Sequence, residues 1–150
     1  MDDIYNSLDE ITRNFDELVA VEDAIRFPAP SGYRDIKLIF RDKDGLLSEV
    51  QLLPREMYQA KIIETPLYNI VREFANPSIP PSLKNILEAK ATLRRESPAI
   101  YADAEGPIDD IIRYAEGDRN VAFEEAKENI KELGEALYDS AWEKQLTFIQ

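Results

Sequence analysis

Cysteine and histidine are both absent from this sequence of 150 residues. Without cysteine the chain forms no disulfide, and without histidine it also lacks the second common ligand of zinc sites. The same absences exclude Ser-His-Asp and Cys-His nucleophilic catalysis. The five glycines form neither a Gly-x-Gly-x-x-Gly motif nor a Walker-type phosphate loop. The usual signatures of hydrolases, zinc enzymes and dinucleotide-binding proteins are therefore missing.

Long apolar runs are absent as well. No segment approaches the roughly 18 apolar residues that a membrane-spanning helix needs. The acidic start Met1-Asp2-Asp3 lacks the basic and then apolar profile of a signal peptide. We therefore expect a cytoplasmic protein that makes no contact with a membrane.

Basic residues are outnumbered by acidic residues, with 18 Lys and Arg against 30 Asp and Glu, for a net charge of −12. Binding to the backbone of a nucleic acid needs clustered positive charge, so we expect none. Two interpretations of the acidity stay open, namely a well-solvated surface and a protein partner with a basic surface. The oligomeric state is open too.

The residues that are present indicate a small α+β protein. Hydrophobic residues make up 44% of the chain, which is sufficient for a core. Three prolines stand in the segment 76–81, which we interpret as a stiff linker. We expect a partial α/β domain over residues 1–75 and a helical extension over 82–150 that packs on it.

The most distinct elements form a predicted β-hairpin. Ile36, Leu38 and Phe40 alternate along a strand at 34–41, and a second strand spans 46–53. Asp42-Lys43-Asp44-Gly45 between them is typical of a hairpin turn. With a shorter strand at 18–21, we expect a small mixed sheet with a central antiparallel hairpin, flanked by helices.

Helical spacing predicts the remaining elements. Ile4, Leu8, Ile11 and Phe15 share one helix face near the N-terminus. We predict one helix at about 55–64 and a second that starts at Thr65-Pro66. A third helix is predicted to start after a cap at Ser82, and a fourth to run from Gly106-Pro107 to about Gly117. Apolar residues from Val121 to Trp142 predict a long last helix, which faces either the core or a partner.

Two polar residues interrupt the second strand of the hairpin. Glu49 and Gln51 point to the same side because side chains of a strand alternate between faces. Burying them without partners would be costly, so they either mark a site or lie on a solvated face. Tyr33 and Arg34 stand where the first strand begins, either as site residues or as turn residues.

The spacing across this region resembles that of RelA/SpoT-type nucleotidyltransferase domains, most closely their small toxin-like and phage-associated branches. The matching residues run from about 16 to 74: Gly32, Tyr33, Arg34, Asp35, Ile36, Gly45, Glu49, Val50, Gln51, Leu52, Ala60, Lys61, Leu67, Tyr68 and Arg72. These motifs belong to the C-terminal half of the domain.

The resemblance implies a function and a set of site residues. Enzymes of this family, which include alarmone synthetases, are pyrophosphokinases that transfer pyrophosphate from ATP to a ribose hydroxyl of a guanine nucleotide or tRNA. The resemblance also implies that Tyr33 stacks on the acceptor base. It further implies that Glu49 is the catalytic carboxylate, acting on Mg²⁺ or on the attacking hydroxyl. The substrate-binding set implied is Tyr33, Arg34, Gln51, Lys61, Tyr68 and Arg72. An aromatic ring and a metal-binding carboxylate suit a nucleotide substrate.

The sequence departs from the family pattern at three places. The family has an Asp on an earlier strand, preceded by Arg and Lys residues that hold ATP, and this chain starts too late to contain them. Glu64-Thr65-Pro66 stands where the toxin-like branch has a histidine, and Glu22-Asp23 stands where basic residues are common. We therefore expect this chain to bind a guanine or adenine nucleotide, or to regulate, rather than to catalyse alone.

Two alternatives remain. One is a non-catalytic acidic interaction module, such as a phage- or toxin-associated regulator or inhibitor with a basic protein partner. The other is part of an active pyrophosphokinase that another chain completes.

Overall fold

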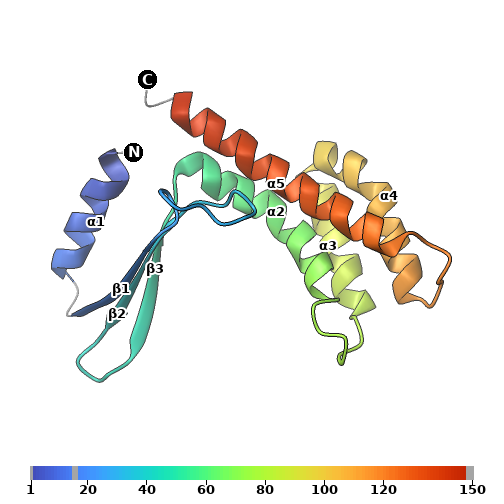
Figure 1. Cartoon of the computed structure of the whole chain (residues 1–150), viewed down its shortest axis with the longest axis horizontal. Helices are drawn as coiled ribbons and strands as arrows, with labels where there is room; N and C mark the ends of the chain where they lie inside the picture. Colours follow the sequence, from blue (N-terminus) through green and yellow to red (C-terminus); the bar gives the residue numbers. More distant parts are fainter. Residues whose placement is uncertain (1, 15–16, 148–150) are drawn as a thin grey trace. The chain divides into compact units, whose positions relative to one another are not determined.

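The computed structural model describes residues 2–14 and 17–147 and confirms the α+β class (Figure 1). Its elements in chain order are α1 Asp2–Asn14, β1 Glu17–Asp23, β2 Ile36–Arg41, β3 Leu47–Leu52, α2 Arg55–Arg72, α3 Leu83–Glu96, α4 Pro98–Ala115 and α5 Phe123–Thr147. The chain divides into a first unit, Met1–Gln59 with Tyr138–Gln150, and a second unit, Ala60–Leu137.

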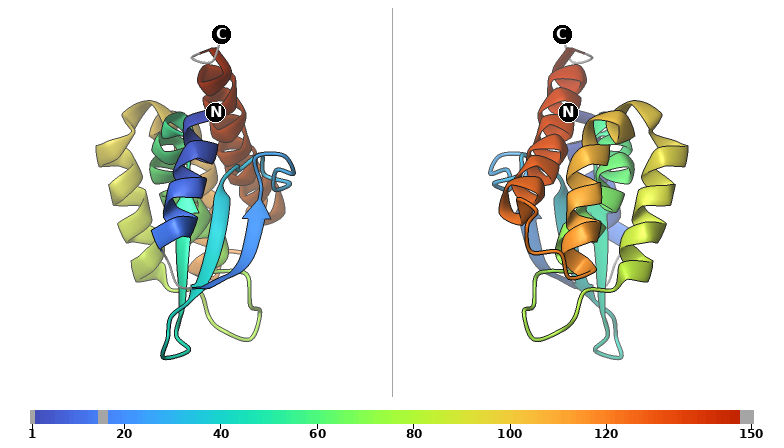
Figure 2. Two further views of the ribbon diagram at one scale, coloured as in Figure 1. Left: turned by 90° about the vertical axis from the view of Figure 1, so that its left-hand side faces the viewer. Right: turned by 90° about the vertical axis from the view of Figure 1, so that its right-hand side faces the viewer.

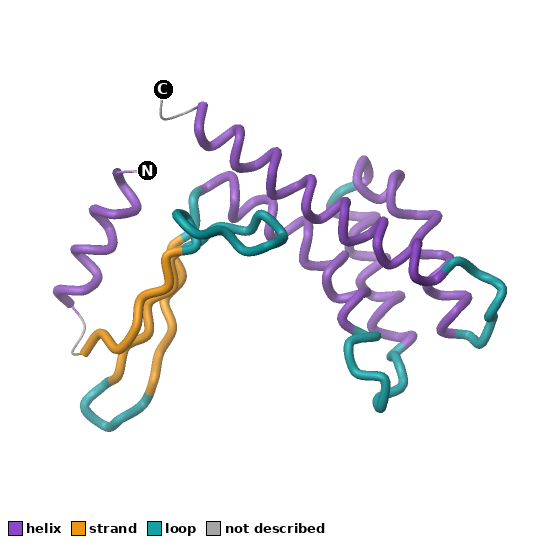
Figure 3. Tube along the Cα trace, viewed as in Figure 1, coloured by secondary structure: helices purple, strands orange, loops and turns teal. Residues whose placement is uncertain are grey.

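The three strands, orange in Figure 3, form one sheet. It has the order β1-β2-β3 and is antiparallel throughout, so the prediction of a mixed sheet is wrong. Parallel pairing needs a long crossover, usually helical, and no helix stands between consecutive strands here. The hairpin is confirmed, with Ile36 opposite Leu52 and Gly45 in the left-handed region at φ +82°. The register of β1 shifts between Leu18 and Ala20, as at a β-bulge.

The core of the first unit lies on one face of the sheet. Ile36, Leu38 and Phe40 are at most 2% exposed. Ile4, Leu8 and Ile11 of α1 pack against them, as their helical spacing predicts. Figure 2 (left) shows α1 lying over this face of the strands. Phe15, the fourth residue of the predicted stripe, lies outside the described residues.

The second unit is a helical cluster to which α2, α3, α4 and α5 contribute. Leu67 and Ile70 of α2 share one hydrophobic core with Ile86 and Leu93 of α3. The segment 76–81, predicted as a linker between domains, therefore lies inside this unit. The predicted cap of α3 is confirmed, because Oγ of Ser82 accepts a hydrogen bond from the backbone N–H of Asn85 at 3.2 Å.

Two prolines lie inside helices, where the sequence predicted helix starts. Helix α2 is continuous through Pro66, and α4 is continuous through Pro107. Each proline removes one backbone hydrogen bond. The apolar residues that follow, Leu67 and Ile70 in α2 and Ile108 and Ile111 in α4, are all fully buried or nearly so. Burial of these side chains offsets the lost bonds and holds each helix together.

The predicted long last helix is α5. Its buried residues include Ala126 and Ile130 in the second unit and Tyr138 and Ala141 in the first, which agrees with a core-facing stripe. Glu124, Glu125 and Glu128 are exposed. In the part of the chain that the structure describes, no helix is both long and apolar enough to cross a membrane.

Candidate nucleotide site on the hairpin

The seven candidate residues fall into two sets. Tyr33, Arg34, Glu49 and Gln51 belong to the first unit, whereas Lys61, Tyr68 and Arg72 belong to the second. The two sets therefore lie in different units.

Glu49 and Gln51 lie on the face of the sheet opposite the hydrophobic core. We call the side that carries Lys37, Ile39, Glu49 and Gln51 the outer face. Gln51 lies directly opposite Lys37 in the register, and Glu49 lies opposite Ile39. Glu49 is exposed and Gln51 is half-buried. The solvated-face interpretation of these two residues is thus correct, and it leaves both side chains accessible to a ligand.

Tyr33 is held by the residue two positions along the chain. Its hydroxyl donates a hydrogen bond to Oδ2 of Asp35 at 3.0 Å, and Asp35 is fully buried. Burial raises the pKa of the Tyr33 hydroxyl, and the negative charges of Asp35 and Glu49 raise it further. Tyr33 itself lies just ahead of β2, whereas Glu49 lies within β3, opposite Ile39.

Arg34 makes internal contacts rather than serving as a solvated turn residue. Its Nη1 donates to the backbone carbonyl of Ile25. Its guanidinium lies over the ring of Trp142, 4.2 Å from the ring centroid, in a cation–π contact. No local sequence pattern could predict this contact, because Trp142 is more than one hundred residues away in the chain.

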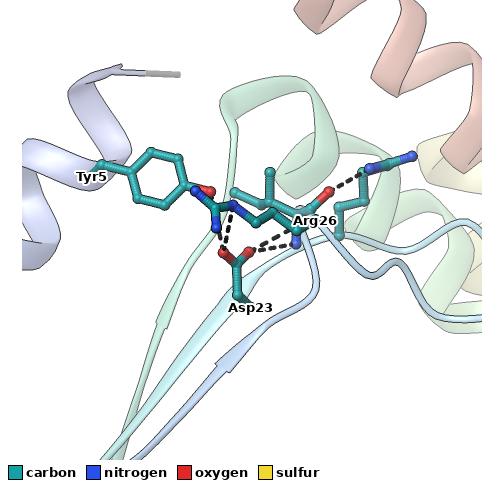
Figure 4. A network of polar contacts seen from close by, with 5 residues as sticks. Tyr5, Asp23 and Arg26 are labelled. Atoms are coloured by element: carbon teal, nitrogen blue, oxygen red, sulfur yellow. Dashed lines mark hydrogen bonds and ion pairs between the residues drawn. The ribbon is translucent and has the colours of Figure 1, made fainter.

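Asp23, which stands where the family often has basic residues, has a structural role (Figure 4). Its Oδ1 accepts hydrogen bonds from the backbone N–H groups of Ile25 at 3.0 Å and Arg26 at 3.2 Å. Its Oδ2 accepts one from the Tyr5 hydroxyl at 3.2 Å. The carboxylate therefore shapes the turn after β1 whose Ile25 carbonyl binds Arg34.

Lys37 is a candidate that sequence reasoning missed. It is half-buried on the outer face and forms a 3.9 Å ion pair with the exposed Glu22. Directly opposite residues on antiparallel strands have Cβ atoms about 5 Å apart, so its side chain starts beside Gln51. The period-two alternation that predicted Ile36 and Leu38 as buried could also have placed Lys37 on the same side as Glu49.

The second-unit candidates share helix α2. The guanidinium of Arg72 lies 5.8 Å from the ring centroid of Tyr68, and both side chains are exposed. Lys61 is half-buried. Arg72 also lines a pocket of about 420 Å³ between α2 and α3, together with Asn69, Glu73 and Asn85. This set offers cationic and polar groups, with the acidic Glu73 among them.

The resemblance implies a Mg²⁺ ion that Glu49 helps to bind. Among residues 2–14 and 17–147, no three carboxylates gather into a group that could hold a metal ion. Glu49 can supply one oxygen ligand, whereas Mg²⁺ takes six ligands in an octahedral arrangement. Gln51 lines a separate pocket of about 380 Å³ with Ile4, Leu53 and Tyr58.

Comparison with known protein families, with curated proteins and with solved structures gave no match to this chain. The family resemblance therefore stays a prediction that rests on the motif residues named above. The fold and the hairpin geometry are independent of it.

Proposed function

We propose that this chain binds a guanine or adenine nucleotide at the open end of the β2-β3 hairpin, and that it does not turn the nucleotide over alone. The observation that carries the proposal is the ring of Tyr33, which is half-buried ahead of β2 and held through its hydroxyl by the buried Asp35. Tyr33 and Glu49 are both motif residues of the RelA/SpoT-like pattern. Glu49 is exposed on β3, so its carboxylate is accessible to a ligand.

The chemistry of the neighbouring side chains supports a nucleotide ligand. An aromatic ring can stack on any nucleotide base, because every base has a π-face. Tyr33 can offer such a ring because its side chain is only half-buried. Glu49 can accept hydrogen bonds from ribose hydroxyls or base amino groups. Lys37 on the same face can neutralise part of the phosphate charge.

The charges present support binding without turnover by this chain alone. Pyrophosphate transfer needs several cationic groups or metal ions around the phosphates of ATP. On the outer face Lys37 pairs with the carboxylate of Glu22, and among the described residues no three carboxylates gather into a group that could hold a metal ion. Mg²⁺ would supply charge neutralisation if it arrived with the nucleotide, with Glu49 as one oxygen ligand.

Thermal unfolding of the purified chain with GTP, GDP and ATP, each with and without Mg²⁺, tests the proposal. A ligand that binds only the folded state stabilises it by about 2.7 kcal/mol at one hundred times its Kd. We expect a rise in Tm that Tyr33→Ala removes. Phe27→Ala, a change at an aromatic side chain of the same unit that is 78% exposed, is the matched control and should leave the rise intact. A Tm that no nucleotide changes would reject the proposal.

A second candidate function is pairing with another chain, either a basic partner or one that completes a pyrophosphokinase. In the described sheet β1 is an edge strand, and its Leu18, Val19 and Val21 are 40–50% exposed. Exposed apolar edge strands are sites at which a further strand can pair. In this case Val21→Lys would weaken the complex that this chain forms in an equimolar mixture with its partner chain, whereas Tyr33→Ala would not. Analytical ultracentrifugation of the mixture measures the complex.

A further inference from the structure

The last turns of α5 contact both residues at the start of β2. We call Tyr138–Thr147 the end segment; it belongs to the first unit, as do Tyr33 and Arg34. The rings of Tyr138 and Tyr33 meet edge to face, with centroids 5.4 Å apart and an interplanar angle of 63°. The ring of Trp142 lies 4.2 Å from the guanidinium carbon of Arg34. The two motif residues at the proposed site are thus both engaged by one helix.

Two further contacts fix the end segment in place. Oε1 of Gln145 accepts a hydrogen bond from the backbone N–H of Glu56 at 3.2 Å. That N–H lies in the first turn of α2, where backbone donors have no partner within the helix. Gly32 lies against Asp139, because a Cβ added there would be 2.8 Å from Oδ1 of Asp139. Gly32 has φ +87°, a conformation that glycine adopts without strain.

The side chains of the end segment sort by helical period. Tyr138 and Ala141 are buried, and Trp142 and Gln145 are half-buried. Asp139, Ser140, Glu143, Lys144 and Leu146 are exposed. The spacing of three, four and seven residues places the first four on a single stripe. This stripe faces the start of β2 and of α2, and Trp142 also packs against the hydrophobic core of the sheet.

We propose that the end segment is an intramolecular cover of the nucleotide site and that nucleotide binding and docking of this segment compete. The inference rests on the proposed function. A base that stacks on Tyr33 needs space next to the ring that Tyr138 contacts. Release of the end segment would also uncover the face of the Arg34 guanidinium that lies on Trp142, while its N–H bond to Ile25 would stay.

Competition of this kind sets the apparent affinity. The measured Kd equals the intrinsic Kd divided by the fraction of molecules in the open state. Opening also exposes the buried Tyr138 and Ala141, so the open state is the minor state until a nucleotide binds it. A partner that captured the end segment would therefore open the site, and one that held it down would close it.

A reversible crosslink tests the cover in the full-length chain. The sequence has no cysteine, so Gly32→Cys with Asp139→Cys creates a single pair. A Cβ at position 32 would lie 3.8 Å from Cγ of Asp139, so a small shift brings the two thiols within bonding reach. Because position 32 has φ +87°, a cysteine there is strained, and the single variant Gly32→Cys measures the cost of that strain. Binding of GTP is measured by calorimetry in the oxidised and the reduced protein. We expect the reduced form to bind at least about tenfold more tightly than the oxidised form.

Controls separate the cover from other effects. Each single-cysteine variant reports the effect of its own substitution and should respond to neither oxidant nor reductant. Gln145→Ala, which removes the acceptor for Glu56, should tighten binding by about twofold to threefold. Leu146→Ala changes an exposed side chain of the same segment and should leave the Kd unchanged.

The outcomes are distinct. Equal affinity in the oxidised and reduced forms would overturn the cover while leaving the nucleotide site intact. Tighter binding in the oxidised form would also overturn it, because the end segment would then build the site. Absence of binding in the oxidised, reduced and Gln145→Ala proteins would overturn the nucleotide site, and the cover with it.

Discussion

At the scale of single residues, Tyr33 concentrates the interactions on which the proposed function depends. Its ring contacts Tyr138, its hydroxyl bonds to the buried Asp35, and its pKa responds to Glu49. A tyrosine in a plain turn would need none of these contacts. The hydrogen bond to Asp35 restricts the orientation of the ring, which lowers the entropic cost of stacking on a base, whereas the Tyr138 contact is the one that the base would replace.

Tyr33→Phe should reduce stability and change its dependence on pH. The change removes a hydrogen bond to a buried carboxylate, so the free energy of unfolding should fall by about 1–2 kcal/mol. Because the folded-state pKa of Tyr33 is raised, its contribution is full below the ordinary tyrosine pKa of about 10 and is lost as pH rises through the raised value. Urea unfolding between about pH 8 and pH 11 measures how the free energy of unfolding depends on pH.

The Tyr33→Phe variant should lose stability less steeply with rising pH than the wild type. The control Tyr58→Phe, at a residue that is 55% exposed, should match the wild type. Identical pH profiles for Tyr33→Phe and the wild type would contradict the assignment.

At the scale of elements, hydrophobic burial overrides local signals. Pro66 and Pro107 lie inside α2 and α4 although proline usually starts or ends a helix. The serine and proline at 97–98, by contrast, do begin α4, with Pro98 in its first turn. Within α4, Pro107 therefore removes a backbone hydrogen bond of the helix interior, whereas Pro98 stands where no such bond is needed.

Two substitutions in α4 separate these positions. Pro107→Ala restores a backbone N–H in the helix interior and should raise the free energy of unfolding by about 1–3 kcal/mol. Pro98→Ala changes a residue at the helix start, where its N–H would have no helical partner, and should alter stability by less than about 0.5 kcal/mol. Chemical denaturation of both variants provides the measurement. Equal changes in the free energy of unfolding for the two variants would show that a proline inside α4 costs no more than one at its start.

Glu73 should stabilise the loop between α2 and α3 in a pH-dependent way. Its carboxylate accepts hydrogen bonds from the backbone N–H of Ser82 at 3.0 Å and from Nδ2 of Asn85 at 2.9 Å. The bond from Ser82 is the main cause that lowers the pKa of Glu73, and the bond from Asn85 lowers it further. The contribution is full above the ordinary carboxyl pKa and is lost as pH falls through the lowered value. Glu73→Gln should lower stability by about 1 kcal/mol at neutral pH and by less in acid.

The control for this loop is Glu88→Gln on α3. Glu88 forms a 3.8 Å ion pair with Lys84 in which both side chains are largely exposed, and such pairs contribute little. Its unfolding curve should follow that of the wild type at each pH. A loss at neutral pH as large as that of Glu73→Gln would contradict the role given to the Glu73 hydrogen bonds.

At the scale of the whole molecule, the sequence predicted what local patterns determine. The alternation of Ile36, Leu38 and Phe40 gave β2, and the turn ending at Gly45 gave the hairpin. The Ser82 cap was likewise local. The contact of Trp142 with Arg34 was not predictable, because it depends on the position of a helix distant in the chain. The long-range part of the candidate site was therefore visible only in the structure.

The most direct test of the nucleotide site uses Trp142, the only tryptophan in the sequence. Because its ring contacts Arg34, its fluorescence reports on the residues at the start of β2. Titration of the full chain with GTP should give a saturable change in Trp142 emission that is lost in Tyr33→Ala and kept in Phe27→Ala. No saturable change, or an undiminished change in Tyr33→Ala, would contradict nucleotide binding at the hairpin.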